Sequence, residues 1–189
     1  MAGVARGRQL KAPAGSHTRP TSDRVREAMF SMLVSMDAVE GAAVVDLFAG
    51  SGALGIEALS RGAESVTFVD NDRTARDSIS GNLTVLGELA GRAKVVAADS
   101  LRFASTMATA DLVLADPPYD YTEWPALLEE LIGRTRILVA ETGDTWDPGP
   151  AWETVKVKKY GGTVVTVSLP ALPPASQSTQ ARAPRPENN

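Results

Sequence analysis

Residues 44–55 constrain the fold of this 189-residue chain more than any other segment. They overlap an apolar run, 43–48, that only Asp46 interrupts and that is short enough for a buried parallel strand. The run enters a turn with the G-x-G-x-x-G spacing, made by Gly50, Gly52 and Gly55. Because glycine has no Cβ, such a turn lets backbone amides approach a ligand closely. The segment therefore predicts a strand, a glycine turn and a helix that together bind a cofactor containing adenine.

The glycine spacing alone is compatible with a nicotinamide dinucleotide and with S-adenosylmethionine. Asp46 separates the two, because a buried strand tolerates a carboxylate only where something satisfies it. A cationic ligand that carries an amine, such as S-adenosylmethionine, would do so. We therefore predict S-adenosylmethionine as the cofactor. A nicotinamide-dependent oxidoreductase stays as an alternative, although it leaves Asp46 without a role.

Strand-like and helix-like segments alternate along the chain. An amphipathic helix comes first, with apolar residues at Val25, Ala28, Met29, Met32, Leu33 and Met36. Strands are expected near 43–48, 65–70, 93–97, 111–115 and 135–141, and helices near 52–61, 72–86, 99–108 and 122–132. Two β-rich runs, 153–159 and 163–169, then predict an antiparallel hairpin. The expected fold is α/β and Rossmann-like, with a mixed seven-stranded sheet, this C-terminal antiparallel hairpin, and helices on both faces.

Charge is distributed unevenly along the chain. Residues 1–30 hold six basic and two acidic residues, a local charge of +4, whereas the other 159 residues hold 13 basic and 21 acidic ones, or −8. We therefore expect residues 1–20 to form a basic N-terminal arm or ribbon that meets a polyanion, with a solvated terminus as the alternative. Residues 21–169 are expected to form the catalytic domain. The composition of 170–189 predicts a disordered tail.

Cysteine is absent and His17 is the single histidine. This composition excludes disulfides, thiolate metal sites, a cysteine nucleophile and a histidine-rich metal site, so no metal is expected. No run approaches 18 apolar residues and no signal peptide opens the chain. We therefore expect a cytoplasmic protein that does not enter a membrane.

Acidic residues follow the second and third predicted strands. Asp70 lies twenty residues beyond Gly50, where a carboxylate can accept hydrogen bonds from the two hydroxyls of a ribose. Asp72 is better explained as the cap of the next helix, while Asp99 fits a cofactor contact and a helix cap equally well. The neighbouring Asn71 and Ser100 complete the predicted cofactor-binding set.

The fourth strand is followed by Asp116-Pro117-Pro118-Tyr119. Ligands of open α/β sheets bind beyond the carboxyl ends of the strands, so this tetrapeptide is expected to face the glycine turn. Two prolines stiffen the backbone and remove two amide donors, which leaves the Asp116 carboxylate and the Pro117 carbonyl as acceptors. Tyr119 adds a flat ring on which a base can stack. We predict that Asp116, Pro117 and Tyr119 hold a planar amine at the methyl donor, unless the motif is only a rigid turn.

These motifs resemble the amino-methyltransferases that use S-adenosylmethionine, which have the class I methyltransferase fold. Residues 19–30, Arg-Pro-Thr-Ser-Asp-Arg-Val-Arg-Glu-Ala-Met-Phe, resemble more narrowly the RsmD-type enzymes, which methylate guanine N2 in bacterial small-subunit (16S) ribosomal RNA. The resemblance covers roughly residues 3–169. Members usually begin with a further short Arg-Ile-Ile-like strand before the equivalent of Ala2-Gly3, so either a late start site or a missing first strand of the N-terminal ribbon is expected here.

The resemblance also implies roles for individual residues. The methionine side of the cofactor would lie against Asp46, Phe48, Gly50 and Gly52. Asp70 would bind the ribose and Asp99 the adenine amine, with Asp116, Pro117 and Tyr119 at the target base. RNA would be bound by Arg6, Arg8, Lys11, Arg19, Thr21 and Arg24.

The expected function is transfer of a methyl group from S-adenosylmethionine to guanine N2 in small-subunit ribosomal RNA. The target base must leave its stack to enter such a pocket. We expect a monomer that acts on RNA within a small-subunit particle. The alternatives are DNA adenine-N6 or protein glutamine-N5 methylation, a non-catalytic RNA-binding factor, and the oxidoreductase considered above.

Overall fold

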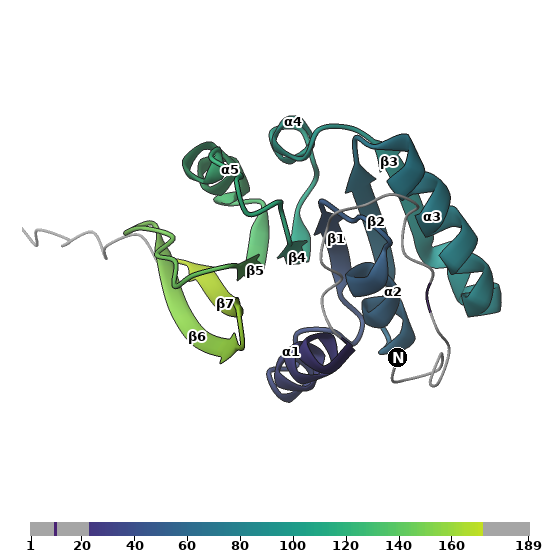
Figure 1. The fold of residues 1–189 in the computed structure, drawn as a ribbon, viewed down its shortest axis with the longest axis horizontal. Coiled ribbons are helices and arrows are strands. Elements are labelled where there is room, and N and C mark those ends of the chain that lie inside the picture. Colours follow the sequence, from purple (N-terminus) through teal and green to yellow (C-terminus); the bar gives the residue numbers. More distant parts are fainter. Residues whose placement is uncertain (1–9, 11–22, 172–189) are drawn as a thin grey trace, which may run out of the picture.

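The computed structural model describes Leu10 and residues 23–171 (Figure 1). The expected arm, 1–20, and tail, 170–189, therefore lie outside the described residues except for Leu10, Pro170 and Ala171. The elements follow one another as α1 (Asp23–Ser35), β1 (Ala43–Leu47), α2 (Ala53–Ser60), β2 (Ser65–Asp70), α3 (Arg73–Leu83), η2 (Thr84–Arg92), β3 (Ala93–Ala97), α4 (Ser100–Ala104), β4 (Ala110–Ala115), α5 (Trp124–Leu131), β5 (Thr135–Thr142), β6 (Trp152–Tyr160) and β7 (Thr163–Pro170).

One mixed sheet of seven strands runs through the molecule in the order β3-β2-β1-β4-β5-β7-β6. Strands β1 to β5 are parallel, and β7 pairs antiparallel with both β5 and β6. The expected mixed sheet with a C-terminal hairpin is confirmed. The strand order reverses between β1 and β4, and such a switch point is where open α/β sheets bind their ligands.

Helices cover both faces of the sheet, as expected (Figure 1). On one face α1, α2 and α3 pack on the strands around fully buried side chains such as Phe30 and Phe68. On the other face α4 and α5 pack against a second cluster that includes Leu47 and Leu127. The strands between these layers are buried on both faces, which explains their nearly continuous apolar sequences.

Helix α1 is attached to α2 by charge as well as by its apolar stripe. Its Arg26 is only 5% exposed and lies 3.5 Å from a carboxylate oxygen of Glu57, which is 1% exposed. Arg61 bonds the other oxygen of Glu57 at 2.8 Å. Removing either partner of a buried ion pair leaves an uncompensated charge in the protein interior. The pair between Arg26 and Glu57 therefore helps to hold α1 against α2.

Two expected helices are shorter than the sequence indicated. The helix expected at 72–86 ends at Leu83, and the chain continues as the 3-10 segment η2, in which Gly87 has φ 59° and ψ −127°. The helix expected at 99–108 is only Ser100–Ala104. Within the described part of the chain, no helix is long and apolar enough to cross a membrane.

Candidate active site

The register of the parallel strands aligns their carboxyl ends in one row. Leu47 of β1 is paired with Val69 of β2 and with Ala115 of β4. The residues that follow, Phe48, Asp70 and Asp116, are therefore neighbours at the carboxyl end of the parallel strands, which we call the carboxyl edge of the sheet. The structure thus brings the ends of three strands together at the switch point, as the sequence predicted.

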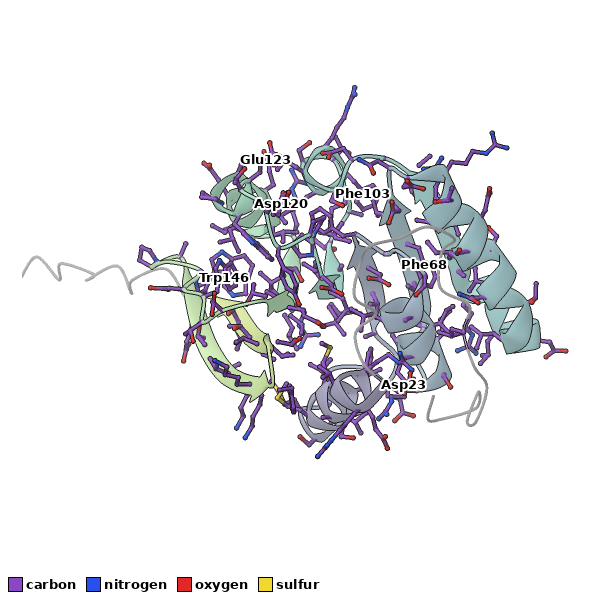
Figure 2. All side chains as sticks on the ribbon, viewed as in Figure 1. Asp23, Phe68, Phe103, Asp120, Glu123 and Trp146 are labelled. Atoms are coloured by element: carbon purple, nitrogen blue, oxygen red, sulfur yellow. The ribbon has the colours of Figure 1, made fainter. Side chains whose placement is uncertain are left out.

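The glycine turn connects this row to α2. Gly50 and Gly52 have φ of 54° and 78°, which an L side chain rarely adopts. Gly55 has a different reason to be glycine, because a Cβ there would lie 2.3 Å from the ring of Phe68 on β2 (Figure 2). The first two glycines shape the turn, whereas Gly55 lets α2 pack closely on the sheet.

Asp46 is 1% exposed, and its Oδ2 accepts a hydrogen bond from the Gly55 N–H at 2.8 Å. The backbone of the chain therefore supplies one of the hydrogen bonds that the buried carboxylate needs, whereas the sequence analysis assigned that role to a cationic ligand. Burial raises the pKa of Asp46 well above its ordinary value of 3.8, and the charges of Asp116 and Asp70 raise it further. A carboxylate can accept about four hydrogen bonds, so this one can also accept from a bound ammonium group.

Asp70 holds the glycine turn in place. Its Oδ2 accepts from the Gly50 N–H and its Oδ1 from the Asp72 N–H, each at 2.8 Å. Asn71, beside it, is exposed. The side chain of Asp72 accepts from the amides of Thr74 and Ala75, which confirms it as the cap of α3. Asp70 therefore couples the end of β2 to the turn after β1, whatever it also binds.

Asp99 and Ser100 both have partners within the chain. Asp99 caps α4 by accepting from the Arg102 N–H at 2.9 Å. Ser100 is 4% exposed, and its hydroxyl accepts from the Phe48 N–H at 3.3 Å. Phe48 has a positive φ of 60°, so this bond helps to hold a strained residue at the end of β1.

Three further aromatic residues, which the sequence did not single out, extend from Phe48 along the same edge. The ring of Tyr121 lies 4.9 Å from that of Phe48 and 5.6 Å from that of Trp124, and Trp124 lies 4.6 Å from Trp146 (Figure 2). Burial, with the nearby charges of Glu123 and Asp99, raises the pKa of Tyr121 to about 12. The signal available in the sequence was the concentration of aromatic residues at 119–124 directly after the tetrapeptide.

The tetrapeptide itself is a stiff, partly exposed turn. Pro117 is buried, and the Pro118 carbonyl accepts from the Tyr121 N–H at 2.9 Å. The side chain of Tyr119 is 63% exposed and its ring lies over Gly143, where a Cβ would come within 3.3 Å of it. Tyr119 therefore presents a ring to solvent at the same edge as Asp116.

Negative charge converges at this edge. Asp46, Asp70 and Asp116 lie close enough for the last two to raise the pKa of the first. Such a site favours a cation, and the chemistry of S-adenosylmethionine, with its sulfonium and ammonium groups, fits it. Of the residues expected to bind RNA, Arg24 is exposed on α1, and Arg6, Arg8, Lys11, Arg19 and Thr21 lie outside the described residues.

The pKa of Asp46 gives a test that separates folding from binding. Because the pKa of Asp46 is higher in the folded protein than the ordinary value of 3.8 in the unfolded chain, the protonated carboxyl group favours the folded state. The protein is therefore most stable with respect to this group below pH 3.8, and it loses that stability as the pH rises through the folded-state pKa of Asp46. Asp46→Asn should therefore raise the Tm of the ligand-free protein more at pH 8 than at pH 5. It should also weaken cofactor binding roughly tenfold to hundredfold, the value of about 1.5–3 kcal/mol for a hydrogen bond to a charged group. Calorimetric titration that finds unchanged affinity would remove Asp46 from the cofactor site.

This fold, with its glycine turn and acidic residues at the switch point, is that of the class I methyltransferases, enzymes that use S-adenosylmethionine as cofactor. Comparison with known proteins narrows the class. The family model described as "Conserved hypothetical protein 95" matches residues 1–168. The YlbH protein of Bacillus subtilis (strain 168), whose name provisionally ascribes to it an rRNA methyltransferase activity, is 43% identical over 132 residues, 68% of this chain and 70% of its own.

Two further comparisons, both with Escherichia coli, agree with this result. "Ribosomal RNA small subunit methyltransferase D" of strain K12 is 41% identical over 133 residues, which span 70% of this chain and 63% of the relative. The solved structure of yhhF, provisionally described as a methyltransferase, superimposes with a TM-score of 0.77 at 30% identity and covers 90% of this chain and 96% of its own. The chain belongs to the Conserved hypothetical protein 95 family, that of the RsmD-type rRNA methyltransferases.

Proposed function

We propose that this enzyme methylates the exocyclic N2 of a guanine in small-subunit (16S) ribosomal RNA, in the cytoplasm, as a monomer acting on a small-subunit particle. The names of the relatives support ribosomal RNA as the substrate. The observation that carries the proposal is the position of Asp116, at the end of β4 and in the same row as Phe48 and Asp70. An acceptor at that point would lie beside the cofactor and could hold an amine.

The cofactor would be bound by groups from three strand ends. Asp46, with Phe48, Gly50 and Gly52, would form the site for the methionine part. Asp70 with Asn71 would bind the ribose, and Asp99 with Ser100 the adenine. The hydrogen bonds that Asp70 and Asp99 make within the chain leave each carboxylate further acceptor sites, so both roles are compatible with the contacts observed.

Bound S-adenosylmethionine supplies an electrophilic methyl group on a sulfonium, so the protein mainly contributes alignment and electrostatics. The Asp116 carboxylate and the Pro117 carbonyl accept hydrogen bonds from the target NH₂ and direct its lone pair toward the methyl carbon. Tyr119 stacks on the base. The bond from the methyl carbon to sulfur breaks as the bond to nitrogen forms, so S-adenosylhomocysteine is the second product. Asp116 would stabilise the positive charge that the nitrogen gains and could take up the proton that it releases.

Ribosomal RNA would also be held by its phosphates. The exposed Arg24 lies in the first turn of α1, next to the basic sequence that contains Arg6, Arg8, Lys11, Arg19 and Thr21. These residues would contact the backbone and set the position of the RNA without reading its sequence.

A transfer assay with three substrate classes tests this proposal. The enzyme, with labelled S-adenosylmethionine, is incubated at one salt concentration with under-methylated small-subunit RNA, with DNA and with a glutamine-containing peptide. We expect label in RNA, and we expect RNA binding to weaken steeply as salt rises, because phosphate contacts release counterions. Preferential labelling of DNA or peptide would assign the site to adenine-N6 or glutamine-N5 methylation instead.

A further inference from the structure

Strand β6 is an outermost strand of the sheet and carries three exposed lysines, Lys156, Lys158 and Lys159. The strand is visible as the outermost arrow of the hairpin in Figure 1. Between 153 and 160 the only acidic residue is Glu153. None of the ion pairs among the described residues involves these three lysines. In a chain with a net charge of −4, this is a local concentration of unneutralised positive charge.

The register places the C-terminal end of β6 at the same end of the sheet as Asp116-Pro117-Pro118-Tyr119. Lys159 of β6 pairs with Val164 of β7, and Val164 pairs with Thr142 at the end of β5. Two residues earlier on β5, Ala140 pairs with Ala115, the residue before Asp116. Lys159 and the tetrapeptide therefore lie in one row, three strand spacings apart, which is about 14 Å at ~4.8 Å for each spacing.

The lysines reach both sides of the sheet edge. Lys156 and Lys158 pair with Val167 and Val165, two fully buried valines in the cluster that α1 covers, so these lysines leave the strand on the α1 face. Lys159 alternates to the opposite face. Positive charge therefore lies on both faces of β6, with Lys159 next to the carboxyl end of the strand.

We propose that Lys156, Lys158 and Lys159 form a second RNA-binding surface, which contacts phosphates of the strand that flanks the target nucleotide. The proposal rests on the proposed function and adds to it where the RNA lies. A strand of about four stacked nucleotides, at ~3.4 Å each, spans the 14 Å from the tetrapeptide to Lys159. The RNA would run along the carboxyl edge of the sheet from β4 past β5 and β7 to β6.

Lysines on an edge strand have another use, since their charge prevents pairing with the edge of a second molecule. The test must therefore separate RNA binding from edge protection. The variant Lys156→Gln/Lys158→Gln/Lys159→Gln removes the row, and Lys156→Arg/Lys158→Arg/Lys159→Arg retains its charge. Lys94→Gln is the matched control, because Lys94 is an exposed lysine on β3, the strand at the opposite edge of the same sheet.

We expect the glutamine variant to raise KM for small-subunit particles about tenfold with little change in kcat. It should also lower the salt slope of RNA binding by roughly two units, at ~0.7 for each phosphate that a lysine no longer neutralises. The arginine variant and Lys94→Gln should behave like wild type. An unchanged KM and slope in the glutamine variant, with or without self-association on gel filtration, would overturn the proposal and leave edge protection as the role.

A measurement on the wild-type protein covers the case in which the glutamine variant fails to fold. Lysine acylation, followed by mass spectrometry with and without small-subunit RNA, should show Lys156, Lys158 and Lys159 protected by RNA and Lys94 unprotected. Equal labelling of all four would contradict the second surface. Failure of the wild-type enzyme to methylate RNA would instead contradict the proposed function. The acylation result would still show whether β6 binds RNA.

Discussion

Replacing Asp116 by alanine is expected to lower kcat for methyl transfer about 10²- to 10³-fold, the cost of removing one preorganised group from a charge that develops in the transition state. The variant should stay folded, because Asp116 follows β4 and lies outside its ladder. Affinity for S-adenosylmethionine should fall only a few-fold. It should fall to some extent, because the substitution removes one of the negative charges that gather around Asp46.

Two substitutions control this prediction. Asp116→Asn keeps an acceptor oxygen but loses the charge, so its kcat should lie between those of the alanine variant and wild type. Asp120→Ala removes an exposed carboxylate four residues away and should leave kcat unchanged (Figure 2). Single-turnover rates measured with saturating cofactor separate chemistry from product release. An Asp116→Ala enzyme that retains more than a tenth of the wild-type rate would show that another group holds the amine.

Replacing Gly55 by alanine should have the largest effect on stability. Its Cβ would lie 2.3 Å from one ring atom of Phe68 and 2.8 Å from Val66, both fully buried on β2. Neither side chain can move away in a packed core, so α2 must shift. We expect the free energy of unfolding to fall by about 3 kcal/mol, seen as a Tm lower by roughly 6–12 °C. Because the Gly55 N–H bonds Asp46, cofactor affinity should fall as well.

Gly81→Ala is the matched control. Gly81 lies in α3, is exposed, and has no atom within 4 Å of the position of its Cβ. Alanine is favoured over glycine in a helix by about 1 kcal/mol, so this variant should melt roughly 2–4 °C higher. Thermal melts of both variants in one buffer check the pair. A Gly55→Ala protein as stable as wild type would mean that α2 is not held tightly against β2.

The strands were predictable because each depends on a local pattern. The bounds of β2 and β3 coincide with the expected 65–70 and 93–97, since short apolar runs between polar and glycine-containing segments define them. The helix ends were less predictable. Helix α3 gives way to the 3-10 segment η2 at Thr84, three residues before the expected end, and Gly87 then interrupts that segment with a non-helical backbone.

Positions in the site were predictable from topology, but contacts within it were not. Knowing that parallel strands end together was enough to bring Asp70 and Asp116 to one edge. The bond from Gly50 to Asp70 joins residues twenty positions apart, and the bond from Phe48 to Ser100 joins residues fifty-two apart. The aromatic row from Phe48 to Trp146 is assembled from three separate segments, which are the turn after β1, the segment that leads into α5, and the loop after β5. No periodicity in the sequence encodes such long-range pairings.

Nucleoside analysis of labelled RNA tests the central claim most directly. Small-subunit particles from cells that lack this enzyme are incubated with it and with methyl-labelled S-adenosylmethionine, and the RNA is digested to nucleosides and separated. The proposed function, with Asp116 as the acceptor of the target amine, predicts label in N2-methylguanosine alone, and none with the Asp116→Ala enzyme. Label in N6-methyladenosine, or unlabelled RNA from an enzyme that binds the cofactor, would contradict it.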